Sequence, residues 1–312
     1  MSSPECDILL GTFNGARWLP AQLDSLLQQT DQDFRLLVRD DGSSDGTCDI
    51  LRAYADRFGD RFRLVKRGRA TGSARGNFSV LMEESEADHV LFCDQDDVWS
   101  PNKVAVLRRL LADAEARFGP DAPVYAATDL TAVDEALKPI AESFWAYKRT
   151  DPELVPDLSR SLLTGAFLGC ASGINRALNR MARPVPPKAT NHDWWSIQVA
   201  ILFGHVVWSP EQTVLYRIHG ANLSRPQEVS ARRYMKARGK VARIRRGLKI
   251  KTDQARELLF RFGDQIPREK RRIVEEFVGL PDRGFLGRRI SVLRWRFLYP
   301  DHVRNAAFLL AI

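Results

Sequence analysis

The chain has 312 residues, 44% of them hydrophobic, and a formal net charge of +8. This length and composition support one large domain with an appendage, or two domains, and exclude a globally disordered chain. No apolar run approaches the ~18 residues of a membrane-spanning helix, and the N-terminal sequence MSSPECDILL does not resemble a signal peptide.

The charge is unevenly distributed along the chain. Residues 1–227 carry 25 Lys and Arg against 30 Asp and Glu, a net charge of −5, whereas residues 228–312 carry 22 against 9, a net charge of +13. Such asymmetry predicts an anionic partner for the last quarter of the chain, either a membrane surface or a nucleic acid.

Cysteine usage indicates a reducing compartment. The four cysteines are widely spaced and form no C-x-x-C pair, which argues against a zinc knuckle; they are Cys6, Cys48, Cys93 and Cys170. We expect reduced, mostly buried thiols and a cytoplasmic location.

The first 120 residues alternate between predicted strands and predicted helices. Apolar runs that end in turns predict strands within 6–13, 34–40, 61–68 and 88–97. Apolar residues at helical spacing predict helices within 16–30, 47–58, 72–85 and 101–118. This alternation is typical of an α/β fold with a mostly parallel central sheet.

The rhythm changes after residue 120. We expect a strand and turn at 124–134, glycine-rich turns and a helix start within 161–182, a helix at 191–204, and two short strands with a loop within 205–225. Basic segments with helical periodicity dominate from residue 229 onward. We therefore expect two units, a catalytic domain at 1–227 and a basic helical region at 228–312.

Polar clusters follow three of the predicted strands. They are Thr12-Phe13-Asn14, Asp40-Asp41 and Asp94-Gln95-Asp96-Asp97. In open parallel sheets, ligands bind outside the carboxyl ends of the strands. The three clusters therefore predict one binding site at this edge of the sheet.

The third cluster contains a D-x-D arrangement. Asp94 and Asp96 can share a hard divalent cation, which prefers oxygen ligands and can neutralise the diphosphate of a nucleotide. Asp-rich turns are common on protein surfaces, so the pattern alone is weak. For Asp97, a helix-capping or exposed turn position is an equally good interpretation.

Two later motifs add candidate residues. In HDWW, Asp193 precedes two tryptophans, where desolvation would raise the pKa of a carboxylate and suit a general base; the alternative is a helix cap beside core tryptophans. In YRIHGAN, Arg217 and His219 lie in a loop after a strand, where the histidine is either a metal ligand or a structural residue.

Seven ordered motifs resemble family 2 glycosyltransferases, most closely the rhamnosyltransferase-like branch of bacterial surface polysaccharide synthesis. The motifs span residues 6–225 and read TFNGARWLPAQLDSLLQQT, RDDGSSDGT, GNFSVLM, CDQDDVWSPNKV, GC…NR, HDWW and YRIHGAN. The resemblance implies a GT-A fold, inverting chemistry and a nucleotide-sugar donor.

The resemblance also assigns roles to individual positions. It implies donor contacts from a set that borders the base, ribose and diphosphate: Gly11, Thr12, Phe13, Asn14, Asp41, Asn77, Asp94, Gln95 and Arg217. It implies that Asp96 and His219 hold Mg²⁺ or Mn²⁺ and that Asp193 is the catalytic base. Trp194 and Trp195 would form an acceptor platform, although core packing is an equal alternative for one of them.

The expected reaction is transfer of a sugar, L-rhamnose from dTDP-rhamnose by resemblance, to a hydroxyl of a lipid-linked saccharide in O-antigen or other surface polysaccharide synthesis. Another nucleotide sugar such as a UDP-hexose, or hydrolysis of nucleotide sugars by a metal-dependent phosphohydrolase, remains an alternative. A nucleic-acid-binding protein is disfavoured because the tail lacks a known motif and the front of the chain is acidic. A homo-oligomer is left open.

The tail segment FLGRRISVLRWRFL interleaves four arginines with large apolar residues, namely Phe285, Leu286, Ile290, Leu293, Trp295, Phe297 and Leu298. Such segments lie flat in a bilayer interface, with the arginines on anionic headgroups. The sequence therefore predicts peripheral attachment to the inner face of the cell membrane; packing of these helices on protein is the alternative.

Overall fold

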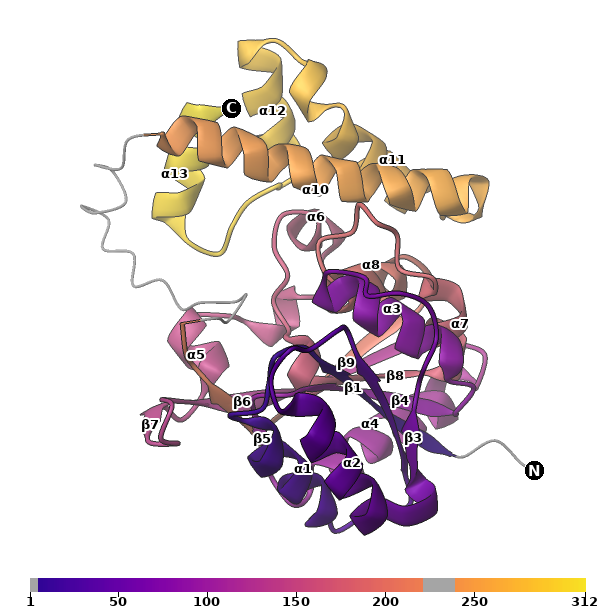
Figure 1. The fold of residues 1–312 in the computed structure, drawn as a ribbon. Helices are drawn as coiled ribbons and strands as arrows, with labels where there is room; N and C mark the ends of the chain where they lie inside the picture. Colours follow the sequence, from indigo (N-terminus) through magenta and orange to yellow (C-terminus); the bar gives the residue numbers. More distant parts are fainter. Residues whose placement is uncertain (1–4, 221–238) are drawn as a thin grey trace.

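The computed structural model describes residues 5–220 and 239–312. A central sheet is covered by helices on both faces, and a group of helices from the end of the chain packs on one side (Figure 1). The boundary expected at residues 227 and 228 lies outside the described residues.

The strands of the sheet run in the order β3-β2-β1-β4-β8-β6-β9-β5, with β7 paired to β6. Their bounds are β1 Cys6–Thr12, β2 Arg35–Asp40, β3 Phe62–Leu64, β4 His89–Asp94, β5 Val98–Trp99, β6 Val124–Val133, β7 Pro139–Ala141, β8 Ser172–Asn175 and β9 His205–Arg217. The longer pairings β1–β2, β1–β4 and β6–β9 are parallel. The expected mostly parallel α/β fold is therefore confirmed.

The helices connect these strands and then continue into the tail. Their bounds are α1 Leu19–Leu27, α2 Thr47–Phe58, α3 Ala74–Glu84, α4 Lys103–Phe118, α5 Phe144–Lys148, α6 Leu158–Ser161, α7 Arg176–Ala182, α8 His192–Phe203, α10 Lys240–Phe262, α11 Arg268–Val278, α12 Phe285–Arg294 and α13 His302–Ala311. Short 3₁₀ turns lie at Gly59–Arg61, Pro152–Leu154, Gly169–Ala171, Gly263–Gln265 and Leu280–Asp282.

The strands are apolar on both faces because each face carries its own core. Ile8 and Leu10 of β1 belong to the core shared with α1 and α4, whereas Leu9 belongs to the opposite core, which includes Phe78 of α3 and Trp195 of α8. Side chains alternate between the two faces of a strand, so a strand buried on both sides must be hydrophobic throughout. This explains why β1 reads as a continuous apolar run.

One strand differs from the expectation for 205–225. The sequence predicts two short strands, but residues His205–Arg217 form the single strand β9, paired with β6 through shifts in register between Thr128 and Thr131. The Ser209-Pro210 pair, which suggests a break, lies at this irregularity, where the ladder tolerates a missing amide. The two-strand prediction is therefore wrong, and the irregularity accounts for it.

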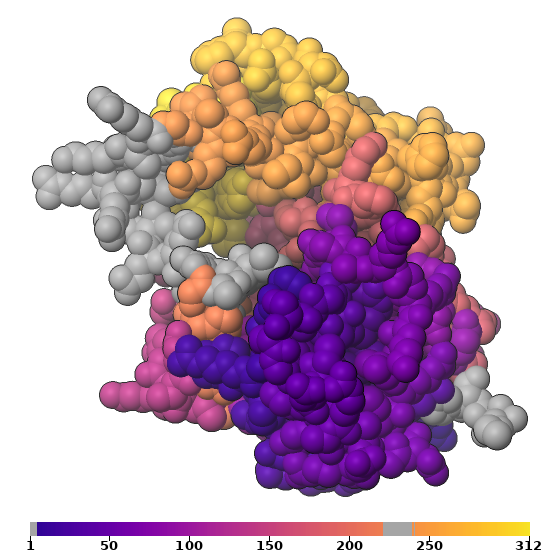
Figure 2. Space-filling view, viewed as in Figure 1, coloured from indigo at the N-terminus to yellow at the C-terminus, as the bar shows by residue number. Residues whose placement is uncertain are grey.

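The C-terminal helices pack against the earlier part of the chain. Phe262 of α10 stacks on Trp195 and contacts Phe203 of α8, and Gln254 donates to Gln198 at 2.7 Å. Figure 2 shows these helices, orange to yellow, as a layer along one side of the molecule, with a hollow where the layer meets the earlier residues. The helical C-terminal region expected from the sequence is thus confirmed.

No helix among the described residues is both long enough and apolar enough to cross a membrane.

Candidate functional site

The register of the parallel strands brings the three polar clusters together. Gly11 of β1 pairs with Asp94 of β4 on one side, and Thr12 pairs with Asp40 of β2 on the other. The ends of β1, β2 and β4 therefore form one edge. A cavity of about 660 Å³ opens at this edge and is bordered on the far side by α8 and residues 168–170.

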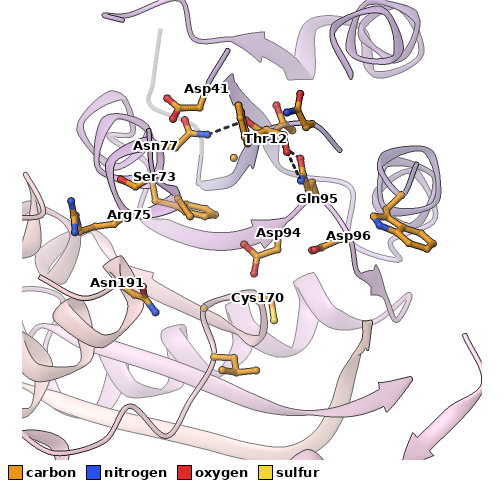
Figure 3. A pocket seen from close by; sticks show the side chains of 18 of the residues that line it. Thr12, Asp41, Ser73, Arg75, Asn77, Asp94, Gln95, Asp96, Cys170 and Asn191 are labelled. Atoms are coloured by element: carbon orange, nitrogen blue, oxygen red, sulfur yellow. Dashed lines mark hydrogen bonds between the residues drawn. The ribbon is translucent and has the colours of Figure 1, made fainter. Parts of the chain in front are cut away.

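Most of the predicted site residues line this cavity. They are Gly11, Thr12, Phe13, Asn14, Asp41, Asn77, Asp94, Gln95, Asp96, Asp193 and His219. Figure 3 shows Asp94 and Asp96 next to one another, with Asn77 and Asp41 on one side and Cys170 on another. Arg217, Trp194 and Trp195 do not line it.

The loop after β1 is fixed by reciprocal hydrogen bonds between Phe13 and Gln95. The Phe13 amide donates to Gln95 Oε1, and Gln95 Nε2 donates to the Phe13 carbonyl, both at 2.9 Å. Gly15 permits this contact, since a Cβ there would lie 2.2 Å from Gln95 Oε1. The Phe13 ring is left 55% exposed at the cavity mouth, where it can contact a flat ligand.

Asp41 and Asn77 build the opposite wall. Asp41 accepts hydrogen bonds from Arg39, from the amides of Thr71 and Gly72, and from the Thr71 hydroxyl. Burial alone would raise the pKa of Asp41, but these bonds outweigh it and hold the pKa below its usual range. Asn77 accepts from the same Arg39 guanidinium at 2.8 Å. Asp41 therefore fixes the loop at 71–72, and its contact with a base stays a prediction.

The acidic cluster carries strong electrostatic repulsion. Burial, followed by the charges of Asp96 and Asp193, raises the pKa of Asp94 to about 7. Asp96 Oδ2 lies 2.8 Å from His219 Nε2, and the His219 ring stacks on Trp18. The cluster is therefore an unfavourable arrangement of negative charge that a cation would relieve.

Asp97 is neither exposed nor a helix cap. Its side chain is fully buried, Oδ1 accepts from the Arg217 amide at 3.1 Å, and Oδ2 has no hydrogen-bond partner. Burial, then Asp96 and Asp94, raises the pKa of Asp97 well above its ordinary value. The exposed-turn interpretation of Asp97 is therefore wrong, because the turn folds back under β9.

Two donor sets could hold a metal ion. Atoms of Asp94, Asp97 and Cys170 lie within 4.8 Å of one another, but burial raises the pKa of the Cys170 thiol, and a protonated thiol is a poor ligand for a hard cation. The two carboxylates Asp94 and Asp96 with the His219 imidazole match the preferences of Mg²⁺ or Mn²⁺ better. The residues present thus fit a divalent metal at the cavity edge.

Asp193 lies across the cavity in the first turn of α8. Its Oδ2 accepts the Gly169 amide at 2.9 Å, and its Oδ1 accepts the Trp194 amide at 2.7 Å. A Cβ at Gly169 would lie 3.3 Å from the Asp193 Cβ and 2.9 Å from His192 Nε2, so only glycine allows this approach. The carboxylate is therefore oriented by the backbone rather than by another side chain.

The two tryptophans of HDWW do not border the cavity. Trp195 is fully buried, and its indole donates to the Ala182 carbonyl at 2.8 Å, which is the core-packing alternative for one of the pair. Trp194 is half-buried, donates to the Ser161 carbonyl at 2.7 Å and packs against Gly165. Arg217 is also displaced from its expected place, because its guanidinium donates to the carbonyls of Asp96 and Glu135.

Sequence reasoning missed several residues at the site. The guanidinium carbon of Arg217 lies 4.5 Å from the centroid of the Trp18 ring. The sequence motif that contains Trp18 predicted only a helix. Lys103 is fully buried behind the acidic turn, donates to the Cys170 carbonyl, and has a pKa that burial lowers to about 8. A lysine after a proline in a helix start carries no sequence signal of burial. Arg75 also lines the cavity and donates to the Ala189 carbonyl.

Comparisons with known proteins bear on the family and the fold. Residues 7–132 match the family model described as glycosyl transferase family 2. An uncharacterised glycosyltransferase of Nostoc sp. is 24% identical over 69% of this chain and 65% of its own length. The dTDP-rhamnosyl transferase RfbG of Shigella flexneri is 30% identical over 30% of this chain, and WfgD of Escherichia coli, a UDP-Glc:alpha-D-GlcNAc-diphosphoundecaprenol beta-1,3-glucosyltransferase, is 31% identical over 31%.

These matches span 34% and 37% of the lengths of RfbG and WfgD. Among solved structures, TarS 1–349 of S. aureus superposes with a TM-score of 0.56 at 15% identity, covering 98% of this chain and 88% of TarS 1–349. The mannosyltransferase PcManGT of Pyrobaculum calidifontis, in complex with GDP-Man and Mn²⁺, gives 0.57 at 16% identity, covering 94% and 74%. The fold is therefore the expected GT-A fold, and the chain carries a glycosyl transferase family 2 domain at residues 7–132.

Proposed function

We propose that this protein transfers a sugar from a nucleotide donor to a hydroxyl of a saccharide acceptor, with inversion at the anomeric carbon. The observation that carries the proposal is the pairing, across one cavity, of an acidic cluster at the end of β4 with a single carboxylate, Asp193, on α8. An inverting displacement needs one base and a stabilised leaving group, and no second carboxylate nucleophile.

In this mechanism Asp193 removes the proton of the acceptor hydroxyl. The acceptor oxygen forms a bond to the anomeric carbon while the bond from that carbon to the diphosphate oxygen breaks, and the electron pair leaves with the nucleoside diphosphate. Asp94, Asp96 and His219 would hold a divalent metal, which supplies positive charge beside the leaving diphosphate. The backbone amides of Gly169 and Trp194 keep the Asp193 carboxylate aimed at the cavity.

The donor is proposed to be dTDP-L-rhamnose, and the pathway bacterial surface polysaccharide synthesis. Similarity to RfbG, a dTDP-rhamnosyl transferase, supports this donor, and similarity to WfgD, which uses UDP-Glc, makes a UDP-hexose the alternative. WfgD is described as acting on a diphosphoundecaprenol-linked sugar, which supports an acceptor linked to a lipid through a diphosphate. Donor consumption that proceeds equally well with water alone would favour the phosphohydrolase alternative.

The test measures nucleotide binding and sugar transfer separately. In Asp193→Asn we expect unchanged affinity for the nucleoside diphosphate and donor consumption lowered at least ~10²-fold, the usual scale for a positioned general base. In Asp96→Asn we expect loss of the Mn²⁺-dependent part of nucleoside diphosphate binding. Asp121→Asn, a change at an exposed turn, is the control. An Asp193→Asn variant with near wild-type turnover would contradict the assignment.

We also propose that α12 attaches the protein to an anionic membrane surface. Phe285, Leu286, Ile290 and Leu293 form one face of this helix and are 57–69% exposed. Arginines 288, 289, 294 and 296 flank that face, and none of them forms an ion pair with a described carboxylate. Of the tail residues expected at the membrane, Phe297 is buried and Trp295 and Leu298 pack on the core. The tail residues expected at the membrane that are exposed therefore all lie on α12.

A further inference from the structure

A second cavity, of about 690 Å³, lies between the front of the chain and the start of α13. Its walls come from α5, from residues 150–155 and 160–168, and from residues 300–304. Leu168 lines both this cavity and the first one. The segment 165–169 that separates the two cavities packs against Trp194 and donates to Asp193. The second cavity is therefore adjacent to the proposed catalytic base.

The lining of this cavity carries more positive than negative charge. It includes four basic side chains, namely Lys148, Arg149, Arg160 and Arg304, and two carboxylates, Asp151 and Asp301. None of the four forms an ion pair with a carboxylate in the part of the chain that the structure describes. The two lining carboxylates serve as helix caps instead: Asp151 accepts the Glu153 amide, and Asp301 accepts the Val303 amide.

These cations also repel one another. Burial, and then the charge of Arg304, lowers the pKa of Lys148. The same two causes lower the pKa of Lys251, whose ammonium donates to the Tyr299 hydroxyl at 2.8 Å. Arg304 thus lies near two lysines, an arrangement that is unfavourable unless an anion binds between the charges. Because Arg149, Arg160 and Arg304 each present a planar fork of N–H donors, a tetrahedral oxyanion is a suitable ligand.

The rest of the lining is apolar. Phe144, Val155 and Ile197 are largely buried in its wall, while Leu154 and Val303 are about two-fifths exposed. A cavity with a cationic cluster and an apolar surface matches a ligand that carries both a phosphate group and a hydrocarbon part. The donor site already accounts for the nucleotide at the ends of β1 and β4, so this second ligand belongs to the acceptor.

We propose that the second cavity binds a diphosphate group of the acceptor and thereby places the acceptor sugar across Leu168, with its hydroxyl at Asp193. This assignment rests on the proposed function, since it locates the binding site of the acceptor. The apolar lining assigns the diphosphate to a lipid-linked acceptor.

The test uses the full chain saturated with nucleoside diphosphate, so that the donor site is filled. Geranyl diphosphate, pyrophosphate and geraniol are titrated by calorimetry at low ionic strength. We expect geranyl diphosphate to bind with one site per chain and geraniol to bind at least roughly tenfold more weakly. Binding of geranyl diphosphate tighter than that of pyrophosphate supports a lipid-borne diphosphate, and equal binding of the two would contradict the assignment to a lipid-linked acceptor.

Single variants locate the site. Lys148→Gln, Arg160→Gln and Arg304→Gln should each weaken geranyl diphosphate binding roughly tenfold, the scale of one charge-assisted hydrogen bond, with nucleoside diphosphate affinity unchanged. Arg246→Gln removes an exposed cation of α10 outside this cavity and is the matched control. Absent binding, equal binding of geraniol, or equal loss in Arg246→Gln would overturn the proposal. These readouts need no sugar transfer, so they stand apart from a failure of the proposed activity.

Discussion

His192 makes a specific prediction about stability at acid pH. Its imidazole is 6% exposed, stacks on Phe78 with ring centroids 3.9 Å apart, and meets the edge of Phe92 at 4.6 Å. Its Nε2 has no hydrogen-bond partner. Burial in this aromatic setting lowers the pKa of His192 from 6.5 to about 4, with the Asp193 charge acting in the opposite direction.

The sign follows from the proton balance. The folded pKa lies below the unfolded pKa, so between pH 4 and pH 6.5 the unfolded chain binds more protons than the folded chain. The stability associated with neutral His192 is complete above pH 6.5 and is lost as the pH falls toward 4. The whole difference corresponds to about 3 kcal/mol, and roughly 2.5 kcal/mol of it is lost by pH 4.5.

The variant His192→Phe isolates this contribution, because phenylalanine keeps the ring contacts and cannot be protonated. Urea unfolding followed by tryptophan fluorescence gives the free energy of unfolding at pH 7.5, 5.5 and 4.5. Overpacking could shift the variant by a constant ~1–3 kcal/mol, so the measured quantity is the change with pH in the difference from wild type. His302→Asn, a change at an exposed histidine, is the control. Parallel curves for wild type and His192→Phe would refute the reasoning.

Two further predictions concern Gly169, which lies beside Asp193, and the exposed face of α12. Gly169→Ala would place a methyl group 2.9 Å from His192 Nε2 and 3.3 Å from the Asp193 Cβ, so transfer should fall roughly ten- to a hundredfold with donor binding retained. Gly284→Ala, where a methyl group meets no atom within 4 Å, should change neither rate nor affinity. Replacing both Leu286 and Ile290 by Gln should abolish co-sedimentation of the full chain with anionic vesicles at low salt, whereas Ile140→Gln on β7 should not. Equal sedimentation of the wild type, the double variant and Ile140→Gln would exclude α12 as the attachment surface.

The fold could be predicted from the sequence where local patterns and topology agree. The apolar runs of β1, β2 and β4 alternate with helices, and this alternation already requires a parallel sheet. The strand β5, only two residues long at Val98–Trp99, could not be predicted, because it exists through its pairing with Val214 and Leu215 far along the chain. The continuity of β9 could not be predicted either, because it depends on pairing with β6, which stabilises a segment interrupted by a proline.

The cavity edge at the ends of β1, β2 and β4 was predictable from the sequence, whereas the buried side of the acidic turn was not. Residues at the ends of parallel strands must meet, so Thr12, Asp41 and Asp94 could be grouped without a structure. The burial of Asp97 and Lys103 depends on how β9 covers the turn, and β9 is far from the turn in sequence. Likewise, Trp194 and Trp195 are neighbours in sequence but are fixed by the carbonyls of two different segments.

The tail shows how one composition can serve two roles. Basic and apolar residues alternate throughout 239–312, which predicts amphipathic helices but not what each helix contacts. In α10 and α11, apolar residues such as Leu258 and Phe277 are fully buried in the core, although Phe260 of α10 is 88% exposed, and α12 keeps Leu286 and Ile290 exposed. Packing therefore accounts for the buried residues of α10 and α11, and the membrane interpretation stays a proposal about α12.

The two proposals together put acceptor binding at the junction between the N-terminal domain and the tail. The sheet edge formed by the ends of β1, β2 and β4 lies within residues 7–132, which match the family model. Residues 300–304 line the second cavity together with residues of α5 and α6, and the exposed face of α12 belongs to the same C-terminal helices. A lipid-borne acceptor would have its hydrocarbon part at the membrane, its diphosphate on Arg160 and Arg304, and its sugar at Asp193. Recognition of the acceptor would then depend on the C-terminal helices, and changes there should alter acceptor choice while leaving nucleotide affinity intact.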